Sequence, residues 1–152
     1  MTDKRENGIR ILLLAVLIAW TVFIFARSLK SAVDSTAESA FFLELIRRFI
    51  PSASMHFVRK LAHFTEFFIL GCLACVFFRS AFVRRKRPLV FAAAASSCYG
   101  LAAAVTDEFL QLTSPGRSCQ ISDMLLDLSG VLAGTVLLAV LFYFFKRRKE
   151  YD

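Results

Sequence analysis

Four long runs of apolar residues dominate the pattern of the sequence. They cover approximately residues 9–27, 55–78, 88–112 and 121–145. A helix of about 20 apolar residues rises about 30 Å, which matches the hydrocarbon core of a bilayer. The pattern therefore predicts a single membrane domain, residues 1–152, that is all-α: a polytopic membrane helix bundle with four transmembrane helices. The first run is long for a cleaved signal peptide and no A-x-A site follows it, so we expect an uncleaved span.

The polar connection between the first two spans contains one amphipathic stretch. Apolar residues recur there at helical spacing, namely Phe42, Leu45, Ile46 and Phe49. The spacing predicts an amphipathic helix at the membrane interface, although a helix packed on its own neighbours would give the same pattern. Ser35 to Glu38 fit a capping box, which predicts that this helix begins at Ser35. Ser52 or Ser54 can cap the second span.

Composition and charge favour a membrane protein and exclude several other classes. The chain is 57% hydrophobic, with a mean hydropathy of +0.60 and a net charge of +7 from 19 basic and 12 acidic residues. The basic residues flank apolar runs without a nucleic-acid recognition motif, so we expect membrane lipids and no nucleic acid as partners. The second loop and the C-terminal tail are the richest in Lys and Arg, which predicts a multi-pass protein of the cell membrane with cytoplasmic N- and C-termini.

The cysteines predict neither a disulfide nor a cofactor site. Cys72 and Cys75 form a C-x-x-C, but they lie inside an apolar helix, where neither zinc binding nor thioredoxin-like chemistry is expected. No H-E-x-x-H or similar zinc motif is present. We therefore expect no cofactor.

Ionisable and polar residues interrupt three of the spans, where charge is costly and usually functional. They are Arg59, Lys60, His63 and Glu66 at the start of the second span, Asp107, Glu108 and Gln111 at the end of the third, and Asp123 and Asp127 at the start of the fourth. Arg117 lies in the Pro-Gly loop between the last two spans. With both termini cytoplasmic, all of these residues fall at the outer end of the bundle. We therefore predict that they share one outward-facing polar pocket.

The same residues carry a resemblance to a known family. The segments RKLAHFTEFFILG (59–71), DEFLQLTSPGRSCQISD (107–123) and LLDLSGVLAG (125–134) resemble the signature blocks of the VanZ-like family, in the same order and spacing. Three positions depart from its pattern: Phe67 replaces a frequent Tyr, Leu110 stands where many members have His, and Cys119 stands where Gly is common.

The resemblance implies a bacterial membrane protein similar to those associated with teicoplanin resistance. It also implies functional roles for Lys60, His63, Glu66, Asp107, Glu108, Gln111, Arg117, Asp123 and Asp127. Arg59, Lys60 and Arg117 suit anionic groups, because a guanidinium can hold phosphate or carboxylate through two hydrogen bonds. The pocket could therefore bind an envelope lipid, a lipid-linked wall precursor or the glycopeptide itself.

Two alternatives stay open at this point. In the first, the protein is an intramembrane hydrolase of a lipid-linked substrate. His63 with Glu66, Asp107 and Glu108 would then act through acid–base or metal chemistry. In the second, the polar residues only hold the helices together, and Arg117 pairs with Asp107 or Asp123. The sequence leaves open whether there is a reaction, the ligand and the oligomeric state.

Overall fold

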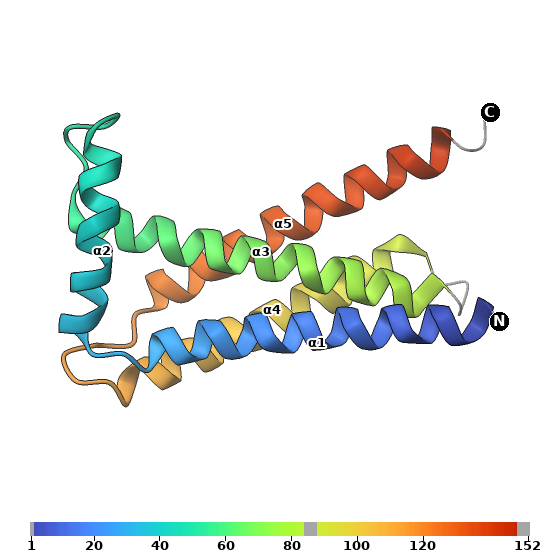
Figure 1. The fold of residues 1–152 in the computed structure, drawn as a ribbon, viewed down its shortest axis with the longest axis horizontal. Helices are drawn as coiled ribbons and strands as arrows, with labels where there is room; N and C mark the ends of the chain where they lie inside the picture. Colours follow the sequence, from blue (N-terminus) through green and yellow to red (C-terminus); the bar gives the residue numbers. More distant parts are fainter. Residues whose placement is uncertain (1, 84–87, 149–152) are drawn as a thin grey trace.

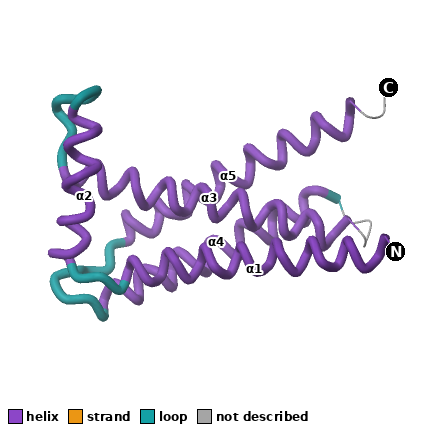
Figure 2. The backbone as a smooth tube through the Cα atoms, viewed as in Figure 1, coloured by secondary structure: helices purple, strands orange, loops and turns teal. Residues whose placement is uncertain are grey.

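The computed structural model describes residues 2–83 and 88–148, which form five helices joined by short loops (Figure 2). The helices are α1 (Thr2–Ser28), α2 (Ala32–Arg47), α3 (Met55–Val83), α4 (Leu89–Leu112) and α5 (Ile121–Arg148). Four of them are long and apolar enough to cross a membrane, over Lys4–Ser28, Met55–Val83, Leu89–Leu112 and Ile121–Phe145. The predicted all-α bundle with four spans is therefore confirmed.

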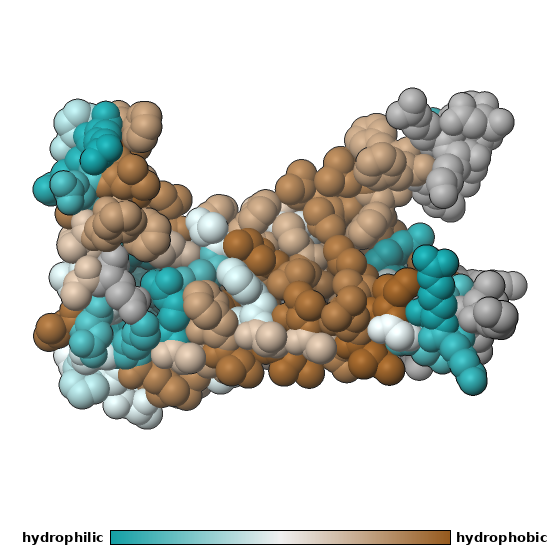
Figure 3. All heavy atoms as spheres, viewed as in Figure 1, coloured by the Kyte–Doolittle hydropathy of each residue, from teal (hydrophilic) through white to brown (hydrophobic). Residues whose placement is uncertain are grey.

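The long helices run roughly along one axis, and α2 lies across one end of the bundle (Figure 1). The start of α1 and the end of α5 both lie at the opposite end, as an even number of spans requires. α5 crosses α3 and diverges from the other helices toward its C-terminal end. A band of hydrophobic residues separates two more hydrophilic ends on the face that Figure 3 shows. Which end faces the cytoplasm stays a prediction, and the basic residues 84–87 of the second loop lie outside the described residues.

Glycines let α3 and α5 pack with their backbones in contact. A Cβ at Gly130 would lie 2.6 Å from the carbonyl oxygen of Phe64, and one at Gly71 would collide with the carbonyl oxygen of Val131. Gly134 faces the backbone of Phe68 in the same way. The Gly130-x-x-x-Gly134 motif therefore does what small-residue motifs do in membranes: it brings two helices into close contact.

α1 is attached to this core by apolar packing and by side-chain hydrogen bonds. Its buried residues Leu17 and Ile24 belong to the main hydrophobic cluster, which includes Phe67 of α3. Trp20 Nε1 donates a hydrogen bond of 3.0 Å to the carbonyl oxygen of Glu66. A further hydrogen bond of 2.7 Å joins the Thr21 and Tyr99 hydroxyls and so ties α1 to α4. These contacts hold the middle of α1 against α3 and α4.

The start of α2 differs from the predicted one. The helix begins at Ala32, and the cap is Ser31, whose side chain accepts a hydrogen bond of 3.2 Å from the Asp34 backbone N–H. The predicted cap at Ser35 is therefore wrong, because Ser31 already satisfies a free N–H one turn earlier. Ser35 instead lies buried inside the helix. The predicted cap of the second span is confirmed at Ser54, which accepts a hydrogen bond from the Phe57 N–H.

The apolar residues of α2 divide between two environments. Leu43 is buried against Ala53 and Val58, which anchors α2 on the start of α3. Leu45 of the predicted apolar stripe is exposed, and Phe49 beyond the end of the helix is 82% exposed. A helix that lies across the bundle end with exposed apolar side chains has the geometry expected at a membrane interface.

Candidate functional site

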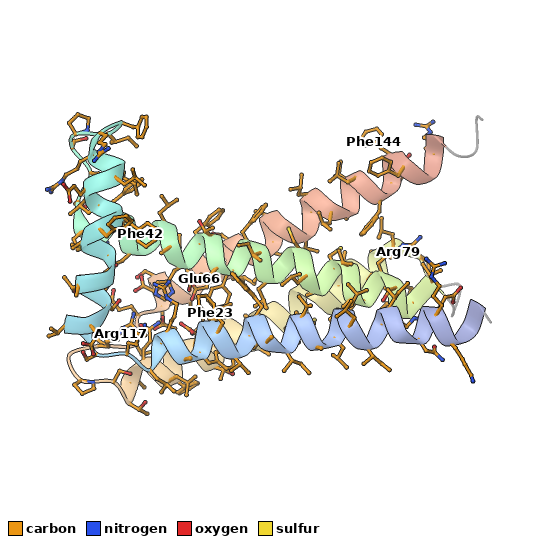
Figure 4. All side chains as sticks on the ribbon, viewed as in Figure 1. Phe23, Phe42, Glu66, Arg79, Arg117 and Phe144 are labelled. Atoms are coloured by element: carbon orange, nitrogen blue, oxygen red, sulfur yellow. The ribbon has the colours of Figure 1, made fainter. Side chains whose placement is uncertain are left out.

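The structure places all ten predicted site residues at the end of the bundle that α2 covers. Figure 4 shows Glu66 and Arg117 at this end, whereas Arg79 lies at the other. α3 is 29 residues long and so spans about 43 Å, more than the roughly 30 Å of a bilayer core. Its polar first turns can therefore lie at headgroup depth while its later turns cross the hydrocarbon.

Basic and acidic side chains lie close together across the helices at this end. The pairs are Arg27 Nη1 with Glu66 Oε1 at 3.0 Å, Lys60 Nζ with Asp123 Oδ1 at 3.5 Å, and His63 Nδ1 with Asp127 Oδ1 at 3.5 Å. The first pair connects α1 to α3, and the other two pairs both connect α3 to α5. Because a lone charge is costly away from water, such pairing is what allows these groups to lie among apolar helices.

Asp107 of α4 is fully buried and links α4 to the end of α1 through a hydrogen bond. Its Oδ1 accepts a hydrogen bond from the Ser28 hydroxyl, and its Oδ2 accepts one of 2.8 Å from Gln111 Nε2. Gln111 lies one turn further along α4, so the local helix geometry itself supplies this partner. The carboxylate is thus held in one orientation by two donors.

Glu108 is also fully buried, but its hydrogen bond is to the loop that follows α4. Its Oε2 accepts a hydrogen bond of 2.8 Å from the Gln120 backbone N–H, just before α5 begins. Its Oε1 is buried and has no hydrogen-bond partner among the described residues. Although Asp107 and Glu108 are adjacent in sequence, they therefore hold different parts of the structure.

Arg117 attaches the loop between α4 and α5 to the end of α1. Its Nη1 donates a hydrogen bond of 3.0 Å to the Ser28 carbonyl oxygen, which also accepts one from Ser114. The predicted pairing of Arg117 with Asp107 or Asp123 is wrong: neither ion pair occurs within residues 2–83 and 88–148. The last carbonyls of a helix lack intrahelical donors, and Arg117 supplies one. Burial, and then the charge of Arg59, lower the pKa of Arg117, but a guanidinium remains protonated at neutral pH.

A polar cavity and an apolar groove lie beside each other at this end. The polar cavity, about 100 Å³, is lined by His56, Arg59, Lys60, His63, Gln111, Arg117, Gln120, Asp123 and Leu126. The apolar groove, about 310 Å³, is lined by Trp20, Phe23, Arg27, Ser39, Phe42, Ile46, Val58, Leu61, Ala62, Thr65, Glu66 and Ile69. Two smaller cavities share walls with both, Arg27 on the groove side and His63 on the cavity side. The two smaller cavities therefore lie between the polar cavity and the apolar groove and share lining residues with each.

Sequence reasoning missed the contribution of α1. Arg27 pairs with Glu66, and Ser28 contacts both Asp107 and Arg117. The topology could have revealed this, because the first span must end at the same membrane face at which the second begins. His56 and Gln120 line the polar cavity and were also missed. Gln120 lies outside the apolar runs, and His56 stands at the very edge of the second run, so the hydropathy pattern marks neither of them.

Four spanning helices with a charged cavity at one end define a polytopic membrane protein. A family model described as VanZ/LLP1 matches residues 13–145 of the chain. The chain therefore belongs to the VanZ-like family, which confirms the resemblance seen in the sequence blocks. No curated protein and no solved structure matches the chain.

Proposed function

We propose that this VanZ-like protein binds the anionic headgroup of an envelope lipid or lipid-linked wall precursor at the outer face of the cell membrane. Through this binding it contributes to glycopeptide (teicoplanin) resistance. The observation that carries the proposal is the cationic polar cavity next to the apolar groove. A ligand with a charged head and an apolar tail fits such a pair of spaces better than a fully soluble one.

The cavity offers cations that are suited to phosphate or carboxylate. Arg59 forms no ion pair with any described residue, and the buried Nε of Arg117 has no hydrogen-bond partner among them. A guanidinium fork can bind an anion through two parallel hydrogen bonds. Lys60 is already partly neutralised by Asp123, so we expect the two arginines to dominate binding.

The groove supplies the apolar half of the site. Trp20 and Phe23 of α1 face Phe42 of α2 and Leu61 of α3 across it. Arg27 lies where the groove meets the smaller cavities, with its guanidinium 5.9 Å from the Phe23 ring centre. A headgroup among the arginines would therefore leave its tail beside aromatic and aliphatic side chains that are open to the bilayer.

Resistance measurements in a suitable host test the proposal. The variant Arg59→Gln removes a cavity cation that makes no structural ion pair, and Arg79→Gln removes a cation at the opposite end of the bundle. We expect Arg59→Gln to lose most of the teicoplanin resistance conferred by the wild type, and Arg79→Gln to retain it, at equal membrane abundance. Unchanged sensitivity when the wild type replaces an empty vector would contradict the resistance role.

Binding is tested separately with purified protein. Native mass spectrometry in nanodiscs can compare phosphatidylglycerol with zwitterionic phosphatidylcholine. We expect retention of the anionic lipid by the wild type and by Arg79→Gln, and at least tenfold weaker retention by Arg59→Gln. Equal retention of both lipids by all three proteins would rule out headgroup recognition by this cavity.

A second candidate function is hydrolysis of a lipid-linked substrate. It is favoured by the position of His63, which lines the polar cavity and contacts the buried Asp127. A histidine oriented by a carboxylate is a common general base. Release of a cleaved headgroup from a lipid-linked wall precursor by the wild type, but not by His63→Gln, would favour hydrolysis over binding.

A further inference from the structure

Three potential metal ligands from three different helices converge beneath the polar cavity. His63 of α3, Asp107 of α4 and Asp127 of α5 each offer one ligand atom, and these atoms all lie within 4.8 Å of one another. At bond lengths near 2.1 Å, two ligands of one zinc ion are at most about 4.2 Å apart. The 3.5 Å between His63 Nδ1 and Asp127 Oδ1 is already within this limit. A small inward movement would therefore complete the geometry.

The hydrogen bonding of Asp127 points independently to a partner beyond His63, with which it makes only the ion pair of 3.5 Å. Its side chain is 0% exposed, and neither of its carboxylate oxygens has a hydrogen-bond partner among the described residues. The same is true of His63 Nδ1. Buried carboxylates in proteins are almost always hydrogen-bonded, paired or bound to a metal, because an isolated one is very costly.

The neighbouring Lys and Arg side chains do not fill this role. Arg27 is engaged by Glu66 and Lys60 by Asp123, and Arg117 donates to the Ser28 carbonyl oxygen. Arg59 also lines the cavity, but it forms no ion pair with either carboxylate. Asp107 and Asp127 together carry two negative charges when ionised, and His63 alone can supply at most one positive charge. A divalent cation would balance both carboxylates and use the free lone pairs of all three groups.

We infer that His63, Asp107 and Asp127 form a divalent-cation site of the transition-metal type, for Zn²⁺ or Mn²⁺. A mixed imidazole and carboxylate donor set suits these ions better than Ca²⁺, which prefers six or more oxygens. The hydrogen bonds from Ser28 and Gln111 to Asp107 have the character of the outer contacts that orient metal-bound carboxylates. Coordination positions not taken by the protein would be reached from the polar cavity that His63 lines.

The ligand set differs from the one that sequence reasoning considered. That set combined His63 with Glu66, Asp107 and Glu108. In the structure Glu66 is paired with Arg27, and Glu108 accepts a hydrogen bond from the loop backbone, so both have other partners. Asp127 of α5 takes their place. The cation site does not depend on the proposed lipid binding, and its test uses no lipid ligand.

Metal analysis of the purified full-length protein tests the site. The protein is treated with a chelator, incubated with Zn²⁺ or Mn²⁺, freed of excess metal and measured by mass spectrometry of the elements. We expect one ion per chain in the wild type, with a higher thermal unfolding temperature in the presence of the ion, because a ligand of the folded state stabilises it. Absence of both effects for both ions would overturn the inference.

Matched variants separate this site from adventitious binding. Asp127→Asn keeps the side-chain shape and removes a ligand, whereas Asp123→Asn removes a nearby carboxylate that is outside the triad. We expect at least about tenfold weaker binding for Asp127→Asn and wild-type stoichiometry for Asp123→Asn, since even outer contacts are worth 10- to 100-fold in affinity. Equal binding by the wild type and Asp127→Asn would also overturn the assignment. If Asp127→Asn does not fold, His63→Gln provides the same comparison, and a change in the visible absorption of bound Co²⁺ between the wild type and His63→Gln reports whether His63 is a ligand.

Discussion

The pair of helices α3 and α5 is built in two contrasting ways along its length. In the middle of the bundle, the Gly71 backbone packs directly on the backbone of Val131, and the atoms nearest to Gly71 belong to no ionisable side chain. Toward the α2 end, the same helices present His63 and Asp127 to each other at 3.5 Å, next to a cavity. The two regions are less than three helical turns apart on each helix.

The difference shows how a membrane bundle can hold costly polar groups in place. Small residues fix the distance between the helices, so the separation of the charged side chains is set by the backbone rather than by their own attraction. The polar end then does not need to be the main source of stability. Substitutions in the two regions should therefore have different consequences, which the following predictions address from the largest expected effect to the smallest.

Gly71→Ala should cause the largest loss of stability. The added Cβ would collide with the Val131 carbonyl oxygen, and a backbone atom cannot move aside cheaply. Overpacking of this kind costs about 3 kcal/mol. Equilibrium unfolding in mixed micelles measures the effect. Gly8→Ala is the control, since a Cβ there meets nothing within 4 Å and should not destabilise the protein. Equal stability of the two variants would show that α3 and α5 do not pack through Gly71.

Glu66→Gln should have an intermediate effect, because it leaves Arg27 without its charged partner. The Glu66 side chain is 11% exposed, and hydrogen bonds to charged groups in such places are worth about 2 kcal/mol. The same unfolding assay applies. Asp123→Asn removes a pair whose side chains are 35% and 28% exposed, and it should cost less than about 1 kcal/mol. A larger loss in Asp123→Asn than in Glu66→Gln would reverse the order that burial predicts.

Labelling of Cys119 perturbs the protein least and tests which side of the membrane the polar end of the bundle faces. Cys119 is exposed in the loop next to α5, whereas Cys72, Cys75 and Cys98 lie within spans. If the polar end faces outward, a membrane-impermeant maleimide should label intact cells through Cys119, and Cys119→Ser should abolish the labelling. Labelling only after the membrane is permeabilised would place this end in the cytoplasm.

The labelling of Cys119 should also depend on pH. Desolvation by the surrounding loop, and then the Glu108 charge, raise the pKa of the Cys119 thiol. The thiolate is the reactive form, so the labelling rate at neutral pH should be below that of a free thiol and should rise as the pH increases through the shifted pKa. A rate equal to that of a model thiol across this range would contradict the effect of the loop.

The spans, and the end of the bundle at which the polar residues lie, could be predicted from hydropathy and topology. That these residues share one pocket stays a prediction, because Glu66, Asp107, Glu108 and Asp127 are not among the residues that line the polar cavity. Asp107 and Asp127 had to meet once their helices ended and began at the same membrane face. The individual partners were not predictable in this way. Ser31 rather than Ser35 caps α2, and Arg117 contacts a helix carbonyl oxygen rather than a carboxylate. In both cases the sequence offers several chemically suitable donors or acceptors, and the local backbone geometry decides which of them is used.

The close contact of Asp107 with the end of α1 also bears on how the protein is made. Asp107 is synthesised long after Ser28, and the helix that carries Asp127 follows later still. Because Asp107 and Asp127 lie near helix ends, α4 and α5 can each enter the bilayer with the acidic end still hydrated among the lipid headgroups. We expect this water to be displaced when α5 docks, so that assembly of the chain ends with a dehydration step confined to one surface of the membrane.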